Sequence, residues 1–353
     1  MVRRVPKGES VKAFVTGGTG FIGSSVVRVL LDRGVEVRAL SRPESDRSNL
    51  AGLDVEIVEG DLRDRGSLNT GAKGCTLVFH VGALYSFWVR PSDLVYKVNV
   101  EGTRNVLAAA LDAGVDRAVY TSSVATLGLR SDGKPADETT PTTLDEIIGD
   151  YKRSKYLAEQ VALEYAEKLP VVIVNPSFPV GPRDTKPTPT GRTILDFLNR
   201  KMPAYVETGM NVVDVEDVAL GHWLAAEKGR TGERYILGGE NVSMKRMLDL
   251  LAEITGLPAP RVRLPYGPIL ALSYLNAAFC RLIPRCTPRM TPETIRMSSH
   301  PMYFDPRKAV EELGFPQTPA VDALAKAVAW FREHGYVIRP RPPVPSGPPA
   351  ART

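Results

Sequence analysis

Cysteine is scarce in this chain, whose 353 residues include only Cys75, Cys280 and Cys286. Three irregularly spaced cysteines are too few for a disulfide framework, and their spacing fits no zinc motif. We therefore expect no metal site, and we expect a protein of the reducing cytoplasm.

Long apolar runs are also absent. Residues 1–10 are partly basic but lack the apolar core of a signal peptide, and no run approaches the roughly 20 apolar residues of a spanning helix. We expect neither secretion nor membrane insertion. The net charge is +5 and the pI is near 9.0, but basic residues are scattered among acidic ones, so no nucleic-acid partner is expected.

The strongest pattern lies near the N-terminus, where Gly17, Gly20 and Gly23 follow the apolar run 11–15 and precede the helical pattern 24–31. Strand, glycine turn and helix in this order let the backbone approach a pyrophosphate and aim the helix N-terminus at its charge. The pattern predicts a dinucleotide-binding site. A tight structural turn without a ligand is the alternative.

The second predicted strand, 35–40, bears on the choice of cofactor. An acidic residue commonly ends this strand and holds the ribose hydroxyls of NAD. Here Ser41 and Arg42 stand in its place, and a hydroxyl beside a guanidinium can accept a 2′-phosphate. We therefore expect NADP, with NAD as the alternative cofactor. A surface role for Arg42 is the competing interpretation.

Further strands are predicted at 54–62, 76–83, 115–120 and 171–174, with helical patterns at 91–114 and 150–168 between the later ones. This alternation is typical of an α/β fold with a doubly wound parallel sheet. Ligands of such sheets lie beyond the carboxyl ends of the strands, so the residues that follow two of them, Asp61, Leu62, Gly82 and Ala83, should line the path of adenine and ribose. His80, inside an apolar strand, is expected to be a hydrogen-bonded core residue.

A catalytic pair is suggested by Tyr151 and Lys155, which lie four residues apart on the predicted helix 150–168 and so share one face. A nearby ammonium favours the phenolate and lowers the phenol pKa from about 10, which suits a general acid/base at a carbonyl. This spacing alone is common on helix surfaces. It gains weight because Ser123 follows the fifth strand and the dinucleotide turn lies upstream.

With these motifs the chain resembles the extended short-chain dehydrogenases/reductases of the NAD-dependent epimerase/dehydratase group, up to about residue 337. The resemblance implies a Rossmann fold and an NAD(P)-dependent enzyme with Asn99, Ser123, Tyr151 and Lys155 as its catalytic set. The expected cofactor contacts are Gly17, Gly20, Phe21, Ile22, Gly23, Ser41, Arg42, Asp61, Leu62, Gly82, Ala83, Tyr151, Lys155, Pro176 and Ser177. The expected substrate contacts are Ser123, Thr126, Arg183 and Arg192.

Three segments, 120–128, 135–141 and 175–191, look like the hopanoid-associated sugar epimerases, which are themselves similar to dihydroflavonol 4-reductases and 3β-hydroxysteroid dehydrogenases. In a sugar-nucleotide enzyme, Arg183 and Arg192 would be placed to grip a diphosphate. Solvated loop arginines are the alternative. Ser41 and Arg42 depart from many sugar epimerases and resemble NADP-using reductases instead.

The expected activity is reversible hydride transfer at a secondary alcohol or ketone of a small-molecule substrate. Epimerisation of a nucleotide sugar ranks slightly ahead of NADPH-dependent reduction of a hydrophobic ketone. An NADP-sensing regulator is the non-enzymatic alternative. The resemblance also implies a homodimer that pairs through the helices 91–114 and 150–168.

We expect a Rossmann domain over residues 1–180, to which strands within 210–238 return. Residues 181–209 and 239–337 should form a smaller substrate lobe, and the proline-rich tail 338–353 should be disordered. The weakly charged run 266–283 is expected to be a core or pocket helix, with peripheral membrane contact as the alternative.

Overall fold

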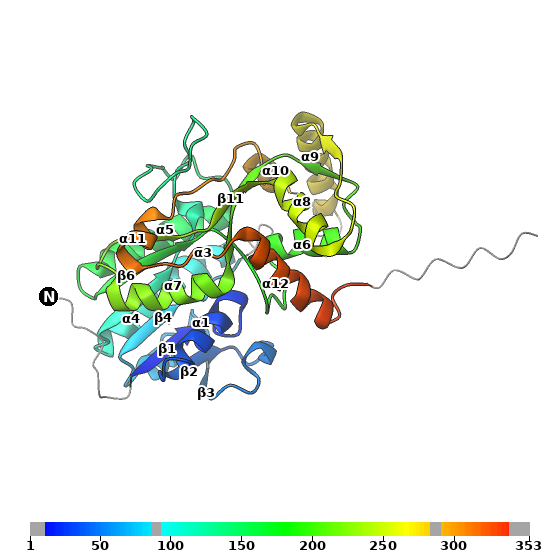
Figure 1. The fold of residues 1–353 in the computed structure, drawn as a ribbon. Coiled ribbons are helices and arrows are strands. Elements are labelled where there is room, and N and C mark those ends of the chain that lie inside the picture. The colour runs from blue at the N-terminus through cyan, green and yellow to red at the C-terminus, as the bar shows by residue number, and fades with distance from the viewer. Residues whose placement is uncertain (1–10, 86–92, 283–290, 339–353) are drawn as a thin grey trace, which may run out of the picture.

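A seven-stranded parallel sheet forms the centre of the molecule (Figure 1). The computed structural model describes residues 11–85, 93–282 and 291–338. In spatial order the strands are β10 (Arg234–Leu237), β6 (Val171–Pro176), β5 (Arg117–Thr121), β4 (Leu77–His80), β1 (Lys12–Thr16), β2 (Glu36–Ser41) and β3 (Val55–Glu59). The doubly wound α/β prediction is therefore confirmed.

The order of the strands places the binding edge. The chain runs from β1 outward to β3 and then returns to the other side of β1 with β4. Strand order thus reverses between β1 and β4, and parallel sheets bind ligands at such a switch point. The two loops that leave these strands touch there, because the Gly82 amide donates to the Thr16 hydroxyl at 3.2 Å.

Helices cover both faces of the sheet. On one face α1 (Phe21–Leu31), α7 (Val215–Lys228) and α11 (Arg307–Leu313) bury side chains such as Val27, Val218 and Leu313. On the other face α2 (Arg65–Ala72), α4 (Gly102–Asp112) and α5 (Asp150–Ala166) bury Leu68, Leu107 and others. Apolar residues three or four positions apart on each helix provide these buried stripes.

A separate apolar core lies between α6 (Pro189–Leu198), α8 (Met244–Thr255) and α12 (Ala320–Glu333). A small sheet of β11 (Glu240–Ser243), β9 (Gly209–Asp214) and β7 (Phe178–Val180) adjoins it, and β8 (Ala204–Val206) pairs with β12 (Val262–Leu264). The sequence-based expectation that both 211–214 and 234–237 rejoin the main sheet is correct for 234–237 and wrong for 211–214. Only β10 does so, by pairing with β6, whereas β9 pairs with β7 and β11.

Several helix ends follow their capping residues. The side chain of Thr188 accepts from the Gly191 amide at the start of α6, and the side chain of Ser243 accepts from the Arg246 amide at the start of α8. The predicted helix 91–114 is divided into α3 (Asp93–Tyr96), a π-helical segment Lys97–Glu101, and α4. Sequence reasoning missed α2, which the Asp64 carboxylate caps, as well as β7, β8, β11, β12 and α10 (Pro292–Met297).

The predicted run 266–283 contains α9 (Tyr266–Leu282), which packs beside α10. In the described part of the chain no helix is both long and apolar enough to cross a bilayer. Cys75 is a free, buried thiol, whereas Cys280 is disulfide-bonded, contrary to the expectation of reduced cysteines. The predicted disordered tail lies outside the described residues beyond Ile338.

Candidate active site

The glycine turn between β1 and α1 is shaped by close backbone contacts. Gly17 has φ +73°, and a Cβ on it would lie 2.6 Å from the Gly82 Cα. A Cβ on Gly23 would lie 2.1 Å from the Gly17 carbonyl oxygen. Larger residues are therefore excluded at both positions. Gly20 precedes α1 without a side-chain cap, so the first N–H groups of the helix keep their capacity to bind an anion.

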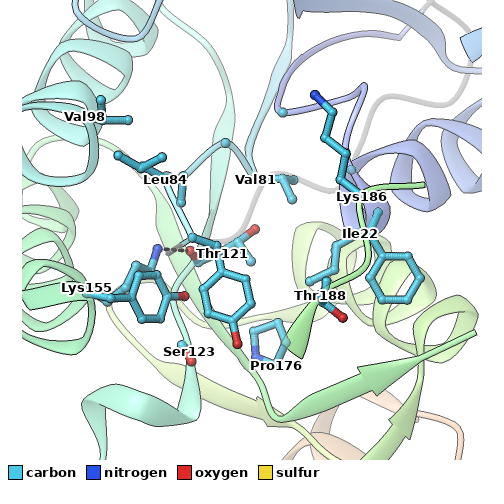
Figure 2. Close-up of a pocket in the computed structure, with 18 of the residues that line it drawn as sticks. Ile22, Val81, Leu84, Val98, Thr121, Ser123, Lys155, Pro176, Lys186 and Thr188 are labelled. Atoms are coloured by element: carbon cyan, nitrogen blue, oxygen red, sulfur yellow. Dashed lines mark hydrogen bonds between the residues drawn. The ribbon is translucent and has the colours of Figure 1, made fainter. Parts of the chain in front are cut away.

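This turn forms one end of a cleft of about 630 Å³ at the carboxyl edge of the sheet. Every residue that we expected to contact the cofactor lines it. Ser123 lines it as well. Figure 2 shows Lys155, Ser123, Leu84 and Val98 toward one side of the cleft and Ile22 and Lys186 toward the other. The fold thus collects residues from the carboxyl ends of six strands, β1 to β6, and from helices α1, α3, α5 and α6 around one cavity.

The end of β2 presents a buried hydroxyl and exposed guanidinium groups. Ser41 accepts a hydrogen bond from Arg47 Nε at 3.1 Å. The half-exposed Arg42 forms one ion pair within the described residues, with Glu44 at 3.4 Å. Arg63, which sequence reasoning missed, also lines the cleft. It donates to both Asp61 carboxylate oxygens, at 2.8 and 3.0 Å, and this pairing lowers the pKa of Asp61.

Lys155 is buried at the start of α5. Its ammonium donates to the Thr121 carbonyl at 2.7 Å, drawn as a dashed line in Figure 2, and to the Tyr120 hydroxyl at 3.0 Å. Burial lowers the pKa of Lys155 to about 7, although the nearby carboxylate of Glu159 opposes the shift. The ammonium is thus poised to change charge near neutral pH.

Tyr151 lines the cleft, and its ring lies 4.7 Å from that of Tyr85. Burial, followed by the effect of Tyr85, raises the pKa of Tyr151. This is opposite to the lowered pKa expected from the spacing of Tyr151 and Lys155. The physical reason is that desolvation disfavours the charged phenolate and that the neighbouring Tyr85 adds to this effect. The neutral phenol is the stable form here, which suits a proton donor.

Ser123 is held by its own backbone neighbourhood. Its Oγ accepts from the Ala125 amide at 3.1 Å, and its carbonyl accepts from the Thr126 hydroxyl at 2.8 Å and the Asn175 amide at 3.1 Å. The buried Glu159 carboxylate accepts from the Asn175 amide at 2.9 Å and lies 2.8 Å from the Thr126 hydroxyl, as an alternative acceptor for its proton. Thr126 is buried in this network rather than among the cleft residues, so it positions the Ser123 loop instead of meeting substrate.

Asn99 lies behind the cleft in the π-helical segment. Its side-chain oxygen accepts from the Leu84 amide at 2.7 Å, and its side-chain amide donates to the Leu84 carbonyl at 3.2 Å and to Ser154 Oγ at 2.9 Å. It therefore ties the loop after β4 to α5. A π-helical segment is frequent at functional sites because it redirects one side chain.

His80 has the predicted core role. Its two ring nitrogens lie 2.7 Å from the Thr16 hydroxyl and 2.9 Å from the Thr103 hydroxyl. Burial, with a smaller contribution from the Lys155 charge, lowers the pKa of His80 to about 3, so the ring stays neutral. It connects β1, β4 and α4 beneath the cleft.

The two arginines predicted to meet substrate are not among the described residues that line the cleft. Arg183 pairs with Glu216 at 3.0 Å, and Arg192 is exposed on α6. The same loop instead supplies Lys186 and Thr188 to the cleft. Sequence reasoning also missed the apolar lining, which includes Leu84, Leu94, Val98, Val124, Phe178, Pro179 and Met302.

Comparison with known proteins agrees with this geometry. The model of the NAD dependent epimerase/dehydratase family matches residues 13–238. The chain belongs to this family. It is an NAD(P)-dependent enzyme with the extended short-chain dehydrogenase/reductase fold.

Similar proteins within the family include both reductases and epimerases. The chain is 50% identical to a "Putative dihydroflavonol 4-reductase" of Synechocystis sp., over 92% of this chain and 95% of that one. It is 39% identical to sterol demethylase protein B of Methylococcus capsulatus, over 92% and 99%. A solved nucleoside-diphosphate-sugar epimerase from Pseudomonas aeruginosa is 31% identical, with a TM-score of 0.76 over 94% of this chain and all of the other.

Proposed function

We propose that this protein is an NADPH-dependent reductase of a hydrophobic ketone, acting reversibly on the corresponding secondary alcohol. The observation that carries the proposal is the lining of the cleft around Tyr151 and Ser123. Leu84, Val98 and Met302 line it together with Val124 and Phe178, while the arginines suited to a diphosphate lie elsewhere. An apolar wall favours an apolar substrate, because burying it against such side chains releases water from both surfaces.

The residues of the cleft fit a nicotinamide cofactor. The glycine turn and the N-terminus of α1 would hold its pyrophosphate, Asp61 and Leu62 its adenine, and Pro176 with Ser177 the nicotinamide end. Ser41 and Arg42 support NADP, because a guanidinium attracts a 2′-phosphate. Bound NADPH supplies the hydride. A side chain at Gly17 or Gly23 would clash with the surrounding backbone and occupy the space proposed for the pyrophosphate.

The chain's own residues would manage the proton. Ser123 would hydrogen-bond the substrate carbonyl oxygen, and Tyr151 would donate the phenolic proton to that oxygen as the carbonyl carbon receives the hydride. Carbonyl, hydride and proton together give the secondary alcohol. Lys155 would stabilise the resulting phenolate by its charge, and Asn99 would keep Leu84 and α5 in place.

A second candidate function, epimerisation of a nucleotide sugar, is favoured by the similarity to the Pseudomonas aeruginosa epimerase. The two outcomes use the same residues and differ in cofactor balance. A reductase consumes one NADPH for each alcohol formed, whereas an epimerase returns the hydride to the other face and consumes none.

The test is to incubate the purified protein with aliphatic and aromatic ketones and, separately, with UDP-sugars, while following nicotinamide absorbance and product stereochemistry. The proposal predicts stoichiometric NADPH loss with at least one hydrophobic ketone and no change in any UDP-sugar. An inverted sugar carbinol without net loss of cofactor would overturn it in favour of the epimerase.

The proposals on oligomeric state and cellular location rest on the family resemblance. We propose a cytoplasmic homodimer that pairs through α4 and α5. Light scattering should give twice the 38.5 kDa chain mass at micromolar concentration. A monomer under these conditions would count against the pairing.

A further inference from the structure

The helix α9 has its large apolar side chains on the outside. Leu272, Leu275 and Phe279 are 52%, 69% and 61% exposed, whereas the side that packs inward consists of the small residues Ser273, Ala277 and Cys280. A surface helix normally turns its bulky apolar stripe toward the core. Here the arrangement is inverted, and Figure 1 shows α9 at the periphery, away from the seven-stranded sheet.

The exposed apolar surface is concentrated at this place. Of the twelve exposed large hydrophobic side chains in the described residues, six lie between Val262 and Phe279. Leu272, Leu275 and Phe279 follow the i, i+3, i+7 spacing of one helical stripe. Tyr274, together with Tyr266 at the start of the helix, adds amphipathic rings of the kind that favour a membrane–water boundary.

The charge of the same segment has one sign. Between Glu253 and Glu293 the sequence contains five arginines and no aspartate, glutamate or lysine, although the whole chain has 40 acidic residues in 353. Arg261 immediately precedes β12 and Arg263 lies on it. Both are exposed, and in the described part of the chain neither has an ion-pair partner. The two guanidinium groups lie two residues apart in the chain, so the positive charge is concentrated beside α9.

We propose that the α9 surface, defined as Arg261, Arg263, Tyr266, Leu272, Tyr274, Leu275 and Phe279, docks on an anionic lipid bilayer. Bulky apolar residues would enter the boundary between headgroups and acyl chains, while the arginines would meet lipid phosphates. A protein partner or a second copy would require a complementary acidic patch, and the unopposed positive charge of this segment repels its own copy. The inference does not depend on the proposed catalytic function.

The experiment is flotation of the full-length protein with vesicles of phosphatidylcholine alone and of phosphatidylcholine with phosphatidylglycerol. We expect binding to the anionic vesicles that weakens as salt is raised, and little binding to the neutral ones. The double variant Arg261→Gln/Arg263→Gln should lower the partition coefficient about 30-fold, or about fivefold for each arginine. The double variant Leu275→Glu/Phe279→Glu should abolish binding.

Two controls keep the result interpretable. Leu129→Glu places the same charge at another exposed leucine, 39% exposed, and should bind vesicles like the unmodified protein. Circular dichroism and NADPH binding should be unchanged in every variant, because these side chains lie outside the cleft. No binding of the folded, unmodified protein to anionic vesicles at low salt would overturn the proposal. So would a dimer that Phe279→Glu converts to monomer without any loss of lipid binding.

Discussion

The Lys155 ammonium lies against Tyr120 in two ways at once: it donates to the hydroxyl at 3.0 Å and sits 4.6 Å from the ring centroid. Both contacts favour the charged lysine, because the hydroxyl oxygen accepts from it and the ring face attracts a cation. Burial lowers the pKa of Lys155 to about 7 although the Glu159 carboxylate opposes the shift, and we predict that the Tyr120 contacts oppose it as well. We therefore predict that Tyr120, a strand residue absent from the predicted site, helps to set the charge of Lys155.

Replacing Tyr120 with phenylalanine tests this relationship. Tyr120→Phe keeps the ring and removes the acceptor, so the pKa of Lys155 should fall by about one unit, the equivalent of one lost charge-assisted hydrogen bond. The limb of the pH profile of kcat/KM that reports Lys155 should move from near pH 7 to lower pH. Tyr156→Phe removes a hydroxyl from α5, the helix that carries Lys155, and is the control. A profile that stays in place would show that the hydroxyl contact does not set the lysine charge.

The glycine turn allows a matched pair of variants. Gly17 and Gly34 have φ values of +73° and +72°, but a Cβ on Gly17 would strike the Gly82 backbone whereas one on Gly34 would meet nothing within 4 Å. Alanine at either position should cost about 1 kcal/mol of stability through the positive φ, and at Gly17 the clash with Gly82 adds to this cost. Only Gly17→Ala should weaken NADPH binding, by at least about tenfold, as measured by calorimetry. Equal NADPH affinities in the two variants would remove the turn from the cofactor site.

Cofactor choice is tested at Arg42. The unmodified protein should bind NADPH more tightly than NADH, and Arg42→Ala should erase most of the difference, about tenfold, by removing a charge-assisted contact to the 2′-phosphate. Arg104→Ala removes a guanidinium that pairs with Glu164 outside the cleft and should leave the preference intact. Equal affinities for both cofactors in the unmodified protein would contradict the assignment of NADP.

Asp184 predicts a pH dependence of stability. Burial raises its pKa from 3.8 to about 6, although hydrogen bonds from Thr188 oppose the shift. The folded protein therefore holds this proton more tightly than the unfolded chain, so the contribution of Asp184 to stability decreases as pH rises from about 4 to about 6. The total loss across this window is about 3 kcal/mol.

Urea denaturation at pH 4 and pH 7 measures this contribution. The difference in unfolding free energy between the unmodified protein and Asp184→Asn should change by about that amount between the two pH values, with the variant relatively more stable at pH 7. Asp54→Asn, at an exposed position, should show no such change. A constant difference for Asp184→Asn would mean that its carboxyl titrates normally.

The sequence predicted the fold and the frame of the site because both depend on local patterns. Glycines at 17, 20 and 23 between a strand and a helix allow few structures, and the carboxyl ends of parallel strands meet at one edge. That was sufficient to bring Asp61, Gly82, Ser123 and Tyr151 to one cleft.

What the sequence could not predict depends on side-chain direction and burial. Arg183 follows a strand that approaches the cleft, yet its guanidinium turns to Glu216, a residue of α7 33 positions away. Thr126 does not line the cleft, because its hydroxyl lies inward against the buried carboxylate of Glu159 on α5. The raised pKa of Tyr151 likewise follows from desolvation, which spacing along a helix does not reveal.

The central claim is that Tyr151 supplies the proton for hydride transfer, and the most direct measurement compares Tyr151→Phe with the unmodified protein on an identified substrate. We predict that kcat falls about 1,000-fold, within the usual contribution of a general acid, while NADPH affinity measured on the same preparation stays within about twofold. Full turnover by Tyr151→Phe, with NADPH bound normally, would contradict the account.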